Sequence, residues 1–263
     1  MPGDAEYQRV SGAVRLRVLQ FAQTAFESLG RWRTADIDRF VAQLVPVVVA
    51  GQRQVATLTD LYLSQQLTAM YGAGAAVGGA LDLDALSGAA LRGGTDPEEV
   101  YRRPAVALYT ALSRGAALPQ AVREGTARLT GLISTDMQLA RTHTTRARLS
   151  QSPAQYYQRT LSGTENCALC VVASTQRYRT DELMPIHPGC DCGVAPARSG
   201  SPHVLDRARL EQIHGAVEAY AGRIARDARE VDYREILVTH THGEYGPTLA
   251  YRGQHFDGPG AVK

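Results

Sequence analysis

The chain has 263 residues and a mass of 28.4 kDa, enough for one large domain or two modest ones. Its composition is 44% hydrophobic and 21% charged, which excludes a wholly disordered chain. The net charge of +2 is too small to indicate a polyanionic partner by itself. We expect neither a secretory signal nor a membrane partner, because the first residues lack a basic stretch before an apolar core and no apolar run approaches the ~20 residues of a membrane span.

Residues 1–150 are predicted to form a helical bundle. Apolar residues recur at spacings of three and four over residues 10–29, which predicts a first amphipathic helix. A second stripe covers residues 34–62, and Pro46 inside it leaves open one bent helix or two helices. A segment rich in Gly and Ala then predicts a flexible connection over residues 72–94. The remaining predicted elements of this half are a short helix over residues 81–86 and helices over 96–114, 119–130 and 132–149.

From Ser150 onward the helical periodicity is lost, and Pro, Gly, Ser and Cys interrupt the chain. A last helix is predicted over residues 204–229, and a β-hairpin over residues 236–256, where two short runs flank a turn that contains Gly. The expected fold is therefore mainly α, with an N-terminal helical bundle, a small α+β region and a C-terminal hairpin. The predicted segments are residues 1–150, 151–203 and 204–263.

All four cysteines lie in two short clusters. The clusters are Cys167-Ala-Leu-Cys170 and His187-Pro-Gly-Cys190-Asp-Cys192. Two residues between the first pair allow both thiolates to reach one tetrahedral ion, and the second cluster adds three candidate ligands. In a cytosolic chain this pattern is more typical of a metal site than of disulfides. We therefore predict a structural zinc clip for a loop-rich region with little core, with ligands drawn from Cys167, Cys170, His187, Cys190 and Cys192.

Two alternatives to the zinc clip remain open from the spacing alone. Disulfides can pair one cysteine of each cluster, and the thiols can also stay without a ligand. The clip itself leaves a choice open, because five candidate ligands compete for the four places of a tetrahedral site. Either His187 or one of the cysteines then lies outside the first coordination sphere.

Two further groups of residues are candidates for chemistry. His240 and His242 share one face of the predicted hairpin and are candidate bases of a hydrolase, although a solvated strand face explains them more simply. Arg141, Arg146 and Arg148 concentrate positive charge at the end of the predicted helix 132–149, which suits a helix C-terminus and also predicts contacts to DNA phosphates. The zinc protease pattern H-E-x-x-H and the nucleophile elbow G-x-S-x-G do not occur in the sequence.

Three motifs follow one another in the chain: Leu139-Ala-Arg-Thr-His-Thr-Thr-Arg-Ala, Asn166-Cys-Ala-Leu-Cys and Pro185-Ile-His-Pro-Gly-Cys-Asp-Cys. Together they resemble the MuF-type minor head proteins of tailed bacteriophages, also called head morphogenesis proteins. The second and third motifs, and also the tail from His242 to Phe256, are similar to the version found in phages of actinobacteria. The specific motifs cover residues 140–256. One departure is His143, where the family often has Glu.

This resemblance implies a structural, non-enzymatic minor capsid protein. The implied location is the virion, in the capsid interior or portal region, and the host cytoplasm during assembly. The implied partners are the portal, scaffold or major capsid protein, together with packaged DNA. Similar phage proteins are also described as capsid maturation proteases, which cleave scaffold or capsid protein. In that alternative, His240 and His242 would belong to the catalytic site.

Overall fold

The computed structural model describes residues 4–76, 79–161, 170, 173–174, 177–180, 192–198, 237–242 and 246–251. The chain divides into two compact units. Unit 1 comprises Met1–Gln8, Asp60–Ala80 and Thr145–Lys263, and unit 2 comprises Arg9–Thr59 and Leu81–Thr144. These units differ from the three predicted segments, and that division stays a prediction.

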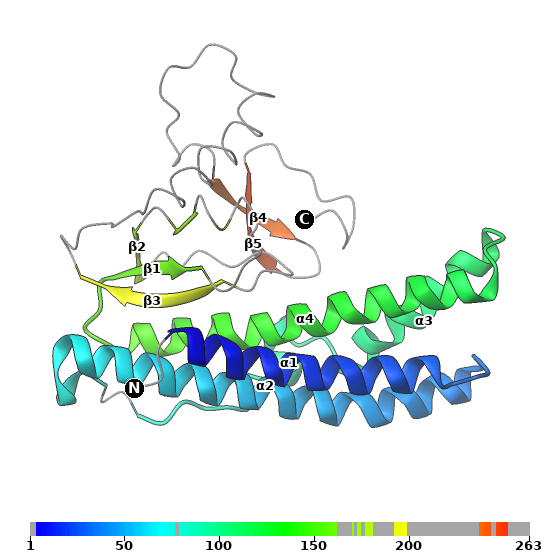
Figure 1. Cartoon of the computed structure of the whole chain (residues 1–263), viewed down its shortest axis with the longest axis horizontal. Coiled ribbons are helices and arrows are strands. Elements are labelled where there is room, and N and C mark those ends of the chain that lie inside the picture. Colours follow the sequence, from blue (N-terminus) through cyan, green and yellow to red (C-terminus); the bar gives the residue numbers. More distant parts are fainter. Residues whose placement is uncertain are drawn as a thin grey trace, which may run out of the picture. The chain divides into compact units, whose positions relative to one another are not determined.

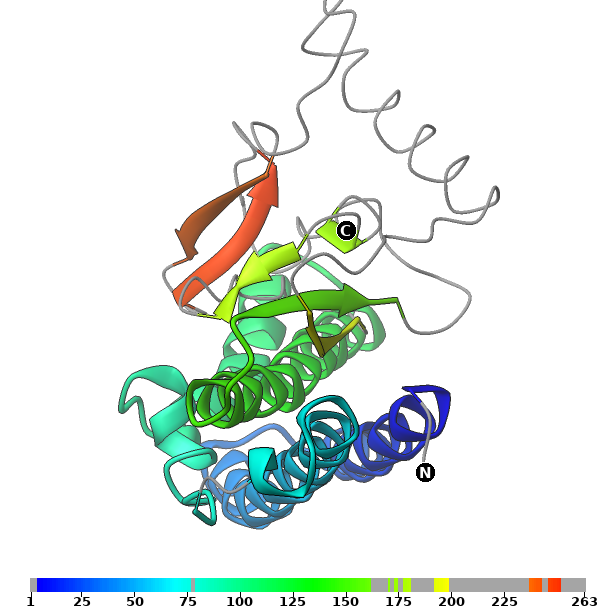
Figure 2. The ribbon, with the colours of Figure 1, turned by 90° about the vertical axis from the view of Figure 1, so that its left-hand side faces the viewer.

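Helices dominate the described part of the first 150 residues, as the sequence predicts. They are α1 (Asp4–Glu27), α2 (Thr34–Tyr71), α3 (Pro97–Ser113) and α4 (Leu118–Ser150), with the short 3-10 helices η1 (Ala73–Ala76) and η2 (Gly88–Arg92). Within unit 2 the ribbons of these α-helices lie side by side in both views (Figures 1 and 2). Their apolar faces form one continuous core, which includes Phe26, Leu44, Leu108 and Leu132, all fully buried. Burial of these faces, more than intrinsic propensity, stabilises helices of this length.

The stripe around Pro46 forms one helix and not two. Pro46 lies inside α2, and its side chain is exposed, whereas Leu44 and Val48 on either side of it are buried. An interior proline costs about 3 kcal/mol in a helix. Burial of each large aliphatic side chain contributes about 1.5–3 kcal/mol, so the long buried face of α2 outweighs that cost.

The predicted break between residues 130 and 132 is wrong, because α4 continues through it without interruption. Glycine at residue 131 costs only about 1 kcal/mol in a helix. Its neighbours Leu129, Leu132 and Ile133 are all fully buried in the core of unit 2. Packing against distant helices therefore overrides the local signal.

Two glycines of α4 make a matched pair for testing this packing. A Cβ atom added at Gly125 would lie 2.9 Å from the Phe26 ring and 3.0 Å from the backbone oxygen of Pro104, whereas one added at Gly131 would meet nothing within 4 Å. We expect Gly125→Ala to lower the free energy of unfolding by about 1–3 kcal/mol through overpacking. Gly131→Ala should instead raise it by about 0.5–1 kcal/mol, because alanine favours the helix. Urea unfolding followed by circular dichroism measures both, and equal effects would contradict this account.

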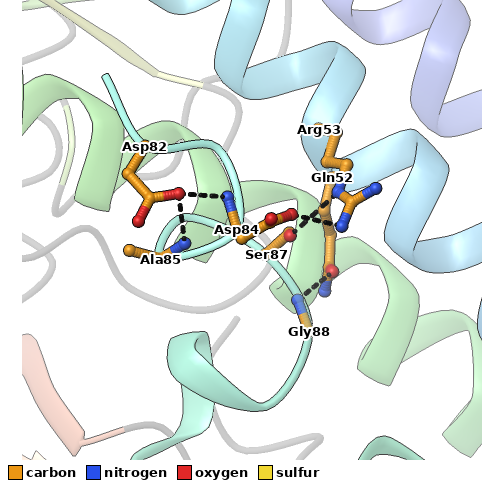
Figure 3. Close-up of polar contacts among 7 residues, drawn as sticks. All are labelled: Gln52, Arg53, Asp82, Asp84, Ala85, Ser87 and Gly88. Atoms are coloured by element: carbon orange, nitrogen blue, oxygen red, sulfur yellow. Dashed lines mark hydrogen bonds and ion pairs between the residues drawn. The ribbon is translucent and has the colours of Figure 1, made fainter. Parts of the chain in front are cut away.

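The segment between α2 and α3 is held to α2 by side-chain contacts, and its short helix lies elsewhere than predicted. Figure 3 shows Asp82 accepting hydrogen bonds from the backbone nitrogens of Asp84 and Ala85, while Arg53 pairs with Asp84. The helical turn η2 covers residues 88–92, whereas the residues 81–86, where the sequence predicts it, are not helical and form bends and a turn over 83–86. The Asp82 carboxylate satisfies the backbone of that turn without a helix.

A buried polar network crosses the core of unit 2. Asp136 on α4 accepts hydrogen bonds from Arg92 Nε at 2.7 Å and from the Tyr101 hydroxyl at 2.6 Å. Burial, reinforced by the Asp136 carboxylate, raises the pKa of Tyr101 well above its ordinary value, so the phenol stays protonated and donates. A pocket beside this network, lined also by Gln52 and Thr95, has room for roughly one water molecule. The network therefore joins η2, α3 and α4 through buried polar contacts.

The described strands form two small antiparallel sheets. The first contains β1 (Tyr156–Thr160), β2 (Arg177–Arg179) and β3 (Gly193–Ala197) in the order β2-β1-β3. The second pairs β4 (Leu237–His242) with β5 (Gly246–Tyr251), which confirms the predicted C-terminal hairpin. The first sheet supplies β structure within the predicted region 151–203, and the α+β character of that region stays a prediction. The helix predicted over residues 204–229 lies outside the described residues.

Strand β1 presents one buried face to the interior of unit 1. Tyr157 and Arg159 are buried, while the residues that alternate with them are only partly buried. Tyr157 packs with Leu67, Leu149 and Val194 in a small apolar cluster. Alternate residues of a strand share a face, so Arg159 and then Leu161 follow Tyr157 on this side. Arg159 contacts Cys192, and Leu161 packs against Cys170 and Cys192.

Candidate metal centre

Cys170 and Cys192 are the two predicted zinc ligands within the described residues, and the structure brings them together. Both side chains are 1% exposed, and their sulfur atoms lie 3.5 Å apart. One comes from each cysteine cluster, twenty-two positions apart in the chain. Cys167, His187 and Cys190 lie outside the described residues.

The distance between the two sulfur atoms differs between a disulfide and a pair of thiolates that bind one zinc ion. A disulfide requires about 2.05 Å between sulfurs, and neither cysteine forms one. Two thiolates on one tetrahedral zinc, each about 2.3 Å from the ion, lie about 3.8 Å apart. The observed 3.5 Å is close to the second value, and it also suits a hydrogen bond in which the Cys170 thiol donates to the Cys192 sulfur. Within the described part of the chain, no group of three or more His, Cys, Asp or Glu is placed to hold an ion.

The start of β3 holds Cys192 in place. The next residue, Gly193, pairs with Thr160 of β1. A Cβ atom at Gly193 would lie 2.5 Å from Gln8 Nε2 and 2.7 Å from Thr160 Oγ1, so a larger residue does not fit without displacing its neighbours. The pairing of Gly193 with Thr160 therefore places Cys192 beside the end of β1, where Leu161 packs against it.

Tyr178 on β2 holds the segment that follows Cys170. Its hydroxyl donates a hydrogen bond to the backbone oxygen of Ala173 at 2.9 Å, and its ring stacks on Tyr157. Burial raises the pKa of Tyr178 far above its ordinary value, so the phenol stays protonated and keeps donating. The tyrosine pair thus links the apolar cluster of unit 1 to the cysteines.

Arg159 is a further member of this site that the sequence does not predict. It is 3% exposed, and its Nη1 lies 3.6 Å from the sulfur of Cys192, to which it donates. Because the periodicity is lost after Ser150, no strand is predicted there. The run Tyr156-Tyr-Gln-Arg-Thr160 is rich in residues that favour strands, and it could have indicated β1. In such a strand Arg159 lies on the same face as Tyr157.

The structure places the two histidines of the protease alternative on β4. His240 is opposite Thr248 of β5 and His242 is opposite Gly246, so the two occupy positions on one face of the strand. Their side chains lie outside what the structure describes. Their role as bases stays a prediction.

The three arginines predicted to contact DNA occupy different environments along α4. Arg148 is 4% exposed, and its Nε lies 2.5 Å from a carboxylate oxygen of Asp60. Arg141 is partly buried and donates to Ser11 Oγ at 2.9 Å. Arg146 is exposed. Of the three, Arg146 therefore has the side chain best placed to reach a phosphate.

Because Arg148 pairs with Asp60, replacing Arg148 should lower the free energy of unfolding more than replacing the nearby Arg146. Arg148→Met should lower the free energy of unfolding by about 2–3 kcal/mol, because it leaves the carboxylate of Asp60, which is three-quarters buried, without this cation. Arg146→Met should change it by less than about 0.5 kcal/mol, since the side chain is exposed. Denaturant unfolding of both variants measures the difference, and equal stability of the two would contradict the structural role of Arg148.

No known protein family, curated protein or solved structure matches this chain. The chemistry of the site is therefore inferred from its own residues. Among the described helices, none combines the length and the apolar character that a membrane span needs.

Proposed function

We propose that this chain is a MuF-type minor capsid protein of a tailed bacteriophage, with a structural role in head assembly near the portal. The observation that carries the proposal is the convergence of Cys170 and Cys192. Each belongs to one of the two cysteine motifs through which the sequence resembles that family. Their 3.5 Å separation supports the zinc clip that both motifs would build together.

The clip would supply folding free energy to a region that has little core of its own. Among the described large apolar side chains, Leu161 is the one that packs against Cys170 and Cys192. Zinc held by four protein ligands is closed to substrate, which suits a structural role. Cys167, His187 and Cys190 would provide the remaining ligands, and four of the five candidates would bind the ion.

The helical half would contact the portal, scaffold or major capsid protein. Helix α3 supports this role with three exposed apolar side chains at spacings of three, which place them along one side of the helix. They are Val106, Tyr109 and Leu112, with exposed fractions of 58%, 41% and 37%. Arg146, exposed on α4, would contribute a phosphate contact to packaged DNA.

Cross-linking followed by mass spectrometry of assembling and mature heads tests this function. We expect the chain in the virion at low copy number, with cross-links from α3 to the portal, scaffold or capsid protein. Val106→Asp should reduce its incorporation, because a charge opposes burial of the apolar side of α3. Ala127→Asp, at an exposed position of α4, is the matched control and should be incorporated normally. A chain that is absent from heads would overturn the proposal.

The same particles test the protease alternative. If the major capsid or scaffold protein loses a segment, and that loss disappears in the double variant His240→Ala, His242→Ala, the chain is a capsid maturation protease. Normal processing in the double variant excludes these histidines as catalytic residues and favours the structural role.

A further inference from the structure

Arg159 occupies a central position in the three-stranded sheet. It lies on β1, the middle strand, and pairs in register with Val194 of β3. Its side chain shares the inner face of β1 with Tyr157, and both are buried. The strand thus directs a cation into the interior of unit 1, beside Cys192.

A neutral thiol is a weak acceptor, whereas a thiolate accepts a charge-assisted hydrogen bond. Cysteine binds metals as the thiolate. A zinc site with three thiolates carries one excess negative charge, and a site with four carries two. A cation 3.6 Å from Cys192 Sγ is therefore complementary to a thiolate at that position.

We infer that Arg159 is a positioning residue of the metal centre, which holds the Cys192 sulfur through an N–H···S hydrogen bond and offsets the negative charge of the thiolates. This inference rests on the proposed zinc clip. Outer partners that orient a metal ligand typically contribute 10–100-fold to metal affinity. Loss of the Arg159 guanidinium should therefore release zinc faster, even where the ligands themselves are unchanged.

The rate of zinc transfer from the full-length protein to a chromogenic chelator tests this role. Arg159→Met removes the cation and keeps much of the side-chain volume, and we expect transfer to accelerate about 10–100-fold. Arg159→Lys retains the charge without the planar fork and should show a smaller acceleration. Arg179→Met is the matched control, because Arg179 is exposed on β2 of the same sheet, and it should release zinc at the wild-type rate. Equal rates for Arg159→Met and Arg179→Met would overturn the inference.

A second measurement uses the wild-type protein and does not depend on folding of a variant. When the site is loaded with ¹¹³Cd, an N–H···S bond to a metal-bound sulfur transmits a scalar coupling between the metal and the donor proton. We expect this coupling at a guanidinium proton of Arg159, and an assigned Arg159 without it would overturn the inference. If the wild-type protein takes up neither zinc nor cadmium, the clip fails and the inference fails with it. Metal uptake with unchanged release from Arg159→Met defeats the inference alone.

Discussion

Replacing Asp136 by Ala is expected to lower the free energy of unfolding of the helical core by about 3–5 kcal/mol, a large fraction of the total stability of a typical domain. The Asp136 side chain is 4% exposed and that of Arg92 is 5% exposed. One carboxylate oxygen accepts from Arg92 Nε and the other from the Tyr101 hydroxyl. The substitution thus leaves a buried guanidinium without this anion and a buried phenol without this acceptor.

Urea unfolding at neutral pH measures this loss, and two variants calibrate it. Tyr101→Phe removes one hydrogen bond to a charged group and should cost about 1.5–3 kcal/mol. Asp84→Ala removes a carboxylate from an exposed pair with Arg53 and should cost less than about 1 kcal/mol. If Asp136→Ala unfolds at the same urea concentration as Asp84→Ala, the network does not stabilise the core as described.

Removal of the zinc that we propose for the clip is the second change for which we expect a large effect. Binding of structural zinc contributes about 10–16 kcal/mol in zinc-finger peptides at neutral pH, which sets an upper bound for the clip. A strong chelator should therefore lower the unfolding temperature of the cysteine region. The apolar core of unit 2 contains no cysteine, so most of the helical circular dichroism should persist after chelation. Elemental analysis should find about one zinc per chain.

Cysteine variants provide the control for this experiment. Cys170→Ser and Cys192→Ser each remove a sulfur of the converged pair, and both should lose zinc and become insensitive to the chelator. Protein purified without chelators that contains no metal, and whose thiols are free or joined in disulfides, would contradict the clip. It would favour one of the two alternatives that the cysteine spacing leaves open.

Local signals made several elements predictable from the sequence. The start of α3 is one case, because Asp96 caps it by accepting a hydrogen bond from the Glu98 nitrogen at 2.9 Å, as its sequence indicates. The C-terminal hairpin is another, because two short runs on either side of a Gly-containing segment pair over β4 and β5. In both cases the deciding interactions join residues close together in the chain.

The sequence by itself thus determined the helical first half, the start of α3 and the presence of two cysteine clusters. The tertiary structure decided the continuity of α4 through Gly131, the pairing of Arg148 with Asp60, and the approach of Arg159 to Cys192. In all three cases the deciding contacts join residues that are far apart in the chain. A glycine in a helix costs about 1 kcal/mol, which long-range burial outweighs, and the partner of a buried charge comes from a distant segment that only folding brings near.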